Sequence, residues 1–211
     1  MKKLSAVLVF VMALLIAAPS VYAQMTRKEQ RKMEKAIKKE AKDLKKQGWI
    51  VAPGNLPLDM QLKDSYQKQM DKDENGYPKF VTGEAMTTGE SYDAALFQAT
   101  ELAKLDLAGK ISTEVTELID TKLANHQLSE KQAASLVESV AASKTLVSQR
   151  LGRVLTPVVM HRDLKNGNIE VRTVIYYSHD LAQKAIKQAM REELEKKADD
   201  LSKQLDEVLG F

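Results

Sequence analysis

The sequence predicts an α+β fold: a three- to four-stranded antiparallel sheet packed by a long helix and a helical hairpin, with charged helices at both ends. Three observations predict it. Residues 154–162 and 169–177 are β-rich with period two, and an Asn-Gly turn signal lies between them. Residues 92–123 repeat apolar side chains at helical spacing. Segments 26–47 and 180–209 have helical patterns and many charges.

Residues 1–23 have the parts of a secretory signal peptide. Lys2 and Lys3 precede an apolar run over 4–18, and Val21-Tyr22-Ala23 is a small-x-small cleavage signal. The run is shorter than the roughly 20 residues that span a bilayer. We therefore expect cleavage after Ala23 and export to the periplasm, the medium or the cell surface. The mature chain is expected to contain no transmembrane segment.

Composition excludes several kinds of chemistry. The chain has no cysteine, so it forms no disulfide, has no thiol nucleophile and cannot be lipidated at a cysteine. Cleavage of the signal peptide removes two lysines and leaves a chain with almost no net charge. The chain also lacks the pattern of basic residues interleaved with aromatic residues that binds single-stranded nucleic acid. We expect no nucleic acid partner and no cofactor.

Residues 24–47 are predicted to form a basic N-terminal helix that ends at Gly48. Ten of its residues are Lys or Arg and four are acidic. One interpretation is a solvated helix with one side docked; the other is a basic arm for an anionic partner such as lipid head groups or an acidic protein. The candidate interaction residues here are Lys35, Lys38, Lys39, Lys42 and, directly after the helix, Trp49. Trp49 is also interpreted as a core or docking residue.

Residues 48–79 are predicted to be a linker with a short amphipathic helix over about 57–70. The linker ends in Asp71-Lys72-Asp73-Glu74-Asn75-Gly76, which follows the opening of a calcium loop. The twelfth position, which should supply a bidentate Glu, is Thr82. We interpret the segment as an acidic turn before a strand, with a weak calcium site at Asp71, Asp73 and Asn75 as the alternative.

Residues 80–178 are predicted to be the core domain. A strand over 80–87 contains Gly83, where another segment is expected to approach closely. Ser91 caps the long helix, and Ser129 begins a capping box for a second helix that forms a hairpin with the first. The apolar stripe of the long helix consists of Ala95, Leu96, Ala99, Leu102, Ala103, Leu107, Ile111, Val115, Leu118 and Ile119. Pro157 places the next strand at an edge or a bulge.

Residues 179–211 are predicted to form a C-terminal helix, capped by Ser178, with an acidic surface. Leu194, Leu201 and Leu205 belong to a coiled-coil seam and are the remaining candidate interaction residues. Because the first helix is basic and the last is acidic, we expect the two to pair antiparallel, in one molecule or between two.

The histidines do not form a metal-binding pattern. His126, His161 and His179 occur in a helix-hairpin turn, a strand and a helix N-terminus, without zinc spacing. His161 is expected near Arg172 across the hairpin. Catalysis by a scattered Ser, His and Asp stays an alternative, but no known nucleophile motif is present.

The middle of the chain resembles a known family. Phe80 to Ala85, Ser91-Tyr92-Asp93-Ala94-Ala95, Ala99 to Lys104 and Leu107 to Ile111 are similar to the pattern of the LPP-twenty-like envelope lipoprotein family and of the N-terminal domain of the flagellar accessory protein FlgT. The segment from Gly48 to Leu58 also resembles the start of secreted proteins of Gram-negative gut bacteria. The resemblance implies a small α/β domain in a non-enzymatic envelope protein, here without the lipoprotein cysteine.

We therefore expect an exported, non-enzymatic cell-envelope protein that acts as a protein-interaction or assembly module. We expect its terminal helices to bind an envelope protein or a second copy of the chain. Peripheral contact with a membrane is a further expected interaction. The alternatives are a weak calcium-dependent binding module and a hydrolase of envelope substrates.

Overall fold

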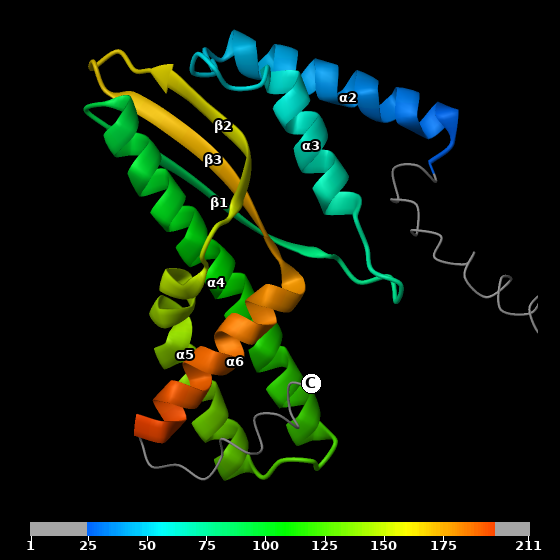
Figure 1. Cartoon of the computed structure of the whole chain (residues 1–211), viewed down its shortest axis with the longest axis vertical. Helices are drawn as coiled ribbons and strands as arrows, with labels where there is room; N and C mark the ends of the chain where they lie inside the picture. Colours follow the sequence, from blue (N-terminus) through cyan, green and yellow to red (C-terminus); the bar gives the residue numbers. More distant parts are fainter. Residues whose placement is uncertain (1–24, 197–211) are drawn as a thin grey trace, which may run out of the picture.

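A computed structural model describes residues 25–196 and has the predicted α+β architecture (Figure 1). A three-stranded antiparallel sheet lies between two helical layers. The elements, in chain order, are α2 (Arg27–Lys46), α3 (Leu58–Met70), β1 (Phe80–Gly89), α4 (Tyr92–Ala124), α5 (Glu130–Arg150), β2 (Leu155–Asp163), β3 (Ile169–Ser178) and α6 (His179–Lys196).

The sheet has the order β1-β3-β2, so the last strand in sequence is central. β2 and β3 form the predicted hairpin, in which Gly167 has a φ of +84° and Asn166 Oδ1 accepts the Asn168 N–H. The expected proximity of His161 to Arg172 assumed that Asn166 and Gly167 are the centre of the hairpin. In the structure Asp163 pairs with Ile169, so the loop is one residue longer. His161 therefore lies opposite Val171, and the expected pairing with Arg172 is wrong by one position.

β3 is buried on both faces of the sheet over residues 173–176. Ile175 belongs to the core beneath α4, whereas Val174 and Tyr176 belong to the core beneath α2 and α3. The Tyr176 hydroxyl is fully buried and forms a hydrogen bond of 2.9 Å with Ser65 Oγ on α3. This contact ties the α2–α3 layer to the central strand.

α4 packs against the other face of the sheet, and Gly83 lets it come close. A Cβ at Gly83 would lie 2.1 Å from the carbonyl oxygen of Ala103. Ala95, Ala99 and Ala103 are fully buried, because their small side chains allow the helix backbone to approach the strands. The close approach expected at Gly83 is therefore confirmed.

Two residues of the predicted apolar stripe are not core residues. Leu102 is 48% exposed and Leu118 is 36% exposed. Each precedes a fully buried residue, Ala103 or Ile119, and one step along a helix turns a side chain by about 100°, to the margin of the buried face.

α5 and α6 pack with the far half of α4 beyond the end of the sheet (Figure 1). α5 begins with the predicted capping box, in which Ser129 and Gln132 exchange hydrogen bonds. Leu194 on α6 is fully buried in this helical core. α2 packs on α3 in the opposite layer, so α2 and α6 are not paired within residues 25–196. The rest of the predicted C-terminal helix lies outside the described residues, so its pairing with α2, in one molecule or between two, stays a prediction.

Candidate interaction surface

The ten basic residues of α2 form one continuous stripe. At about 100° per residue, all ten project within an arc of about 140°, and the four acidic residues of the helix project outside it. The apolar residues Ile37, Ala41 and Leu44 are centred on the opposite side. The members of this basic stripe, all exposed, are Arg27, Lys28, Arg31, Lys32, Lys35, Lys38, Lys39, Lys42, Lys45 and Lys46.

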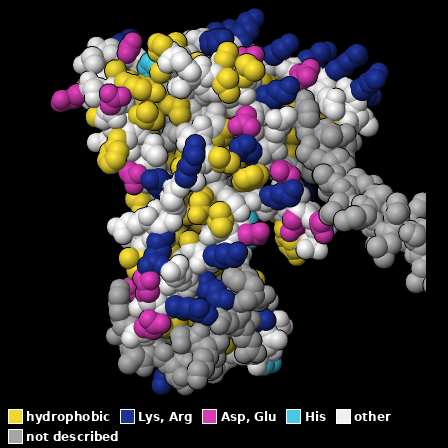
Figure 2. Space-filling view, in the orientation of Figure 1, with side chains coloured by type: hydrophobic (Ala, Val, Ile, Leu, Met, Phe, Trp, Pro, Cys, Tyr) yellow, Lys and Arg dark blue, Asp and Glu magenta, His cyan; other side chains and the backbone are white. Residues whose placement is uncertain are grey.

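The basic stripe extends along the outer margin of the molecule. Figure 2 shows a row of Lys and Arg side chains over α2, on the side away from the sheet. A helix of 20 residues is about 30 Å long, so the stripe offers a straight row of cations of that length. One of the ten, Lys46, forms an exposed ion pair with Asp43 at 3.2 Å.

α2 is held firmly against the α2–α3 core. Thr26 and Glu29 form a capping box at its N-terminus, and the hydrogen bonds from Thr26 lower the pKa of Glu29. Near its middle, the Tyr66 hydroxyl donates to Glu40 Oε2 at 2.8 Å, and this hydrogen bond raises the pKa of Tyr66. The stripe is therefore carried on a docked helix rather than on a free arm.

Trp49 anchors the end of α2 and is not available to a partner. It is 3% exposed and packs in the core beneath α2 and α3, with the Arg162 guanidinium carbon 4.6 Å from the ring centroid. Its interpretation as a core residue is confirmed, and its selection as an interaction residue is wrong. The reason is that Gly48, with a φ of +88°, turns the chain back toward β2, where Ile50 pairs with His161.

The other candidate interaction residues differ in whether the structure exposes them. Lys35, Lys38, Lys39 and Lys42 are exposed together on the basic stripe. Leu194 is buried inside the molecule, so it does not offer a seam to a partner. Leu201 and Leu205 lie outside the described residues.

The acidic segment 71–76 is a tight turn. Asp73 Oδ1 accepts the backbone N–H groups of Asn75 and Tyr77, at 2.9 and 2.8 Å. Asp71 Oδ1 lies 3.1 Å from Lys79 Nζ, an ion pair without hydrogen-bond geometry. Among the described residues no group of three or more His, Cys, Asp or Glu side chains is placed to hold a metal ion. The calcium alternative at Asp71, Asp73 and Asn75 stays an untested prediction.

The outer edge of β2 is occupied by other parts of the chain. Register irregularity between Leu155 and Val158 marks the bulge predicted at Pro157, which has no N–H group. Gln61 Oε1 accepts the Val159 N–H at 2.8 Å, and Ile50 exchanges two backbone hydrogen bonds with His161. These contacts block strand addition along this edge.

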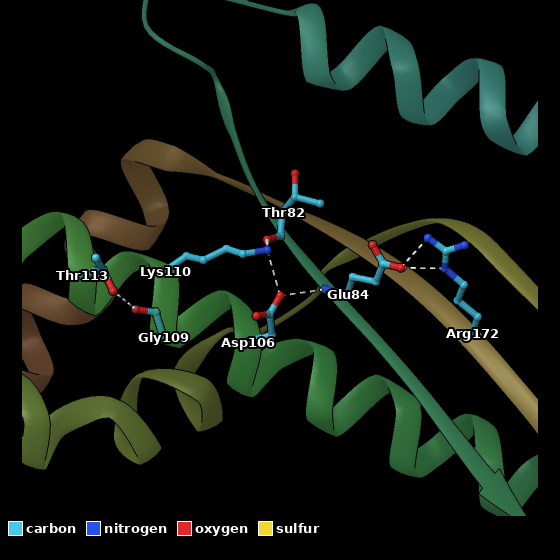
Figure 3. A network of polar contacts seen from close by, with 7 residues as sticks. All are labelled: Thr82, Glu84, Asp106, Gly109, Lys110, Thr113 and Arg172. Carbon is cyan, nitrogen blue, oxygen red and sulfur yellow. Dashed lines mark hydrogen bonds and ion pairs between the residues drawn. The ribbon is translucent and has the colours of Figure 1, made fainter. Parts of the chain in front are cut away.

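The outer edge of β1 is partly occupied by side chains of α4 (Figure 3). Asp106 Oδ2 accepts the Glu84 N–H at 3.0 Å, and Lys110 Nζ donates to the Thr82 carbonyl at 2.9 Å. The two side chains also pair with each other at 2.8 Å. On the neighbouring face Glu84 pairs with Arg172 of β3. Met86, further along β1, is 55% exposed.

Sequence reasoning did not single out these edge contacts. Asp106 and Lys110 have the spacing of an ordinary ion pair on one helix, and only the position of α4 beside β1 turns them toward the strand. The full extent of the basic stripe was available from the sequence, because a helical projection of residues 27–46 separates its basic and acidic side chains.

The side chain of His179 lies within hydrogen-bonding distance of the Glu114 carboxylate. His179 Nε2 lies 3.0 Å from Glu114 Oε2, beside an open pocket of about 450 Å³ that Lys110 and Thr113 also line. The Thr113 hydroxyl donates to the Gly109 carbonyl of its own helix, as Figure 3 shows. His126 is exposed in the α4–α5 turn, and the ring of His161 packs edge-to-face on Tyr92.

No helix within residues 25–196 is both long enough and apolar enough to cross a membrane. Comparison of the whole chain with protein-family models, with curated proteins and with solved structures found no match. The resemblance to the LPP-twenty-like family therefore stays a prediction.

Proposed function

We propose that this chain is an exported, non-enzymatic protein of the cell envelope that binds an anionic partner through the basic stripe of α2. The observation that carries the proposal is the separation of charge on α2. Ten exposed cations project within an arc of about 140°, free of acidic residues, opposite the side that docks on α3. Structural docking alone requires only the apolar side of such a helix.

The arrangement of the sheet edges supports a helical contact surface. β2 is blocked by Pro157, Gln61 and Ile50, and β1 is occupied at Thr82 and Glu84. A partner strand would have to displace these contacts, whereas a partner of the basic stripe displaces only water and counterions.

Hydrolysis is the second candidate, because His179 and Glu114 meet beside a pocket. A His–carboxylate pair can orient a base, but a triad also needs a nucleophile within reach. The hydroxyl of Thr113 in this pocket is engaged by its own helix. The candidate predicts hydrolysis of an envelope substrate that is lost in His179→Ala.

The test of the proposed function is in-cell crosslinking and pull-down of the mature protein at low and high salt. Wild-type protein is compared with a variant in which Lys35, Lys38, Lys39 and Lys42 are changed to Gln. We expect an envelope component, lipid or protein, that is retained at low salt by the wild type and lost in the variant. Equal retention by both proteins would refute the assignment of the basic stripe as the contact surface.

A further inference from the structure

We propose that the anionic partner of the basic stripe is the surface of a lipid bilayer that contains acidic phospholipids. The inference rests on the proposed function and names its ligand class. Membrane contact would be peripheral: α2 would lie along the head groups, and no part of it would enter the hydrocarbon.

The composition of the stripe favours lipid over an acidic protein. Eight of its ten cations are Lys and two are Arg. Protein–protein interfaces are enriched in Arg and aromatic residues and depleted in Lys. Lys is a strongly hydrated point charge on a flexible stem, which suits a diffuse anionic surface better than a rigid bidentate contact.

The stripe also lacks the anchors that specific protein partners use. α2 contains no aromatic residue, and the neighbouring Trp49 is buried in the core. The larger apolar residues of the helix, Met33, Ile37 and Leu44, project away from the stripe and pack against the core. Affinity must therefore come from charge, which is the mode by which basic segments bind anionic bilayers.

The shape of the surface fits a flat ligand. The row of cations is straight, about 30 Å long and located on the outer margin of the molecule (Figure 2). A planar head-group layer can reach the central residues of the arc along its whole length. Each basic residue near such a surface contributes about 1 kcal/mol, an effect that salt screens within a Debye length of about 10 Å.

The experiment is vesicle co-sedimentation of the mature protein isolated from the exporting cell. Vesicles of phosphatidylcholine alone are compared with vesicles that also contain phosphatidylglycerol, at low and high salt. The stripe variant changes Lys35, Lys38, Lys39 and Lys42 to Gln, which keeps helix propensity nearly constant. The matched control changes Lys72, Lys131, Lys165 and Lys184 to Gln, which removes the same charge from exposed positions away from α2.

We expect binding only to vesicles that contain phosphatidylglycerol, and release at high salt. The stripe variant should bind about a hundredfold to a thousandfold more weakly, and the control should keep nearly wild-type affinity. Circular dichroism melting of both variants reports whether the fold is intact. If the stripe variant were unfolded, changing Lys38 and Lys42 alone should still weaken binding about tenfold or more.

Three results would overturn the inference. The first is equal binding by the stripe variant and the control. The second is binding to duplex DNA that is as tight as to anionic vesicles at the same salt. The third is absence of vesicle binding while crosslinking retains an acidic envelope protein through Lys35, Lys38, Lys39 and Lys42. The third result would leave the proposed function standing and exclude only its lipid ligand.

Discussion

The carboxylate of Asp106 on α4 accepts the backbone N–H of Glu84 on β1 at 3.0 Å. A helix side chain thus takes the position that a neighbouring strand would occupy. Lys110, one helical turn later, satisfies the carbonyl of Thr82 at 2.9 Å. Together, these two paired side chains make hydrogen bonds to the β1 backbone that a neighbouring strand would otherwise make.

Asp106→Asn is expected to change how stability depends on pH. Burial raises the pKa of Asp106, but the hydrogen bonds from Lys110 and the Glu84 N–H outweigh it, so the net pKa is lowered. The ionised carboxylate therefore stabilises the fold above the unfolded-state pKa of about 4, and this contribution is lost as pH falls through the folded-state pKa. Urea unfolding should show the wild type more stable by up to about 1 kcal/mol at neutral pH, since solvent weakens the pair. The difference should shrink as pH falls below the unfolded-state pKa of about 4, and a constant difference would contradict this role.

Gln61→Ala is expected to weaken the β2 edge. Gln61 is 4% exposed; its side chain accepts the Val159 N–H and donates to the Leu56 carbonyl. Its loss leaves two backbone groups without their partners, which should cost about 2 to 3 kcal/mol in chemical unfolding. Light scattering should also show faster aggregation, because the strand edge is opened. The control is Gln69→Ala, at an exposed position of the same helix.

Gly83→Ala should be severely destabilising. The added Cβ would lie 2.1 Å from the Ala103 oxygen and 2.8 Å from Leu107 Cβ, so α4 would have to move away from β1. We expect a loss of about 3 kcal/mol or more in thermal or urea unfolding. Gly152→Ala is the control, because a Cβ added at Gly152 would have no atom within 4 Å apart from those of its chain neighbours. Similar stability of the two variants would mean that α4 does not pack on β1 as described.

Thr26→Ala should loosen the first turn of α2. The Thr26 side chain caps the Glu29 N–H and takes part in a capping box, whose loss typically costs about 1 kcal/mol. Hydrogen exchange of the backbone amides near Glu29 should accelerate about fivefold, while amides near Leu44 stay protected. Ser129→Ala removes the equivalent cap of α5 and should leave exchange in α2 unchanged.

The sequence was most informative where the structure depends on neighbouring residues. Thr26, Ser91 and Ser129 begin helices because their side chains bond to amides three residues later. The Asn166-Gly167 turn and the alternation along β3 likewise depend on local geometry. Among these features, Ser91, Ser129 and the Asn-Gly turn predicted two helices and the hairpin.

Features that depend on long-range placement could not be predicted in this way. The sequence left Trp49 open between a core residue and an interaction residue, and the turn at Gly48 and the pairing of Ile50 with His161 bury it. The edge contacts of Gln61 and Asp106 join residues 98 and 22 positions apart in the chain. The four stripe lysines are exposed, in agreement with the local charge pattern of the helix, and their role as interaction residues stays a prediction.

The strand order β1-β3-β2 has a consequence for how the chain folds. β1 ends at Gly89, but its pairing partner β3 begins at Ile169, and the α4–α5 hairpin lies between them. Contacts between distant segments form slowly, whereas helical hairpins form from local contacts. In a chain delivered from its N-terminus, β1 could begin to pair only when Ile169 had emerged and would finish pairing only with Ser178. The order of strands thus delays the pairing of β1 until nearly the whole domain is available.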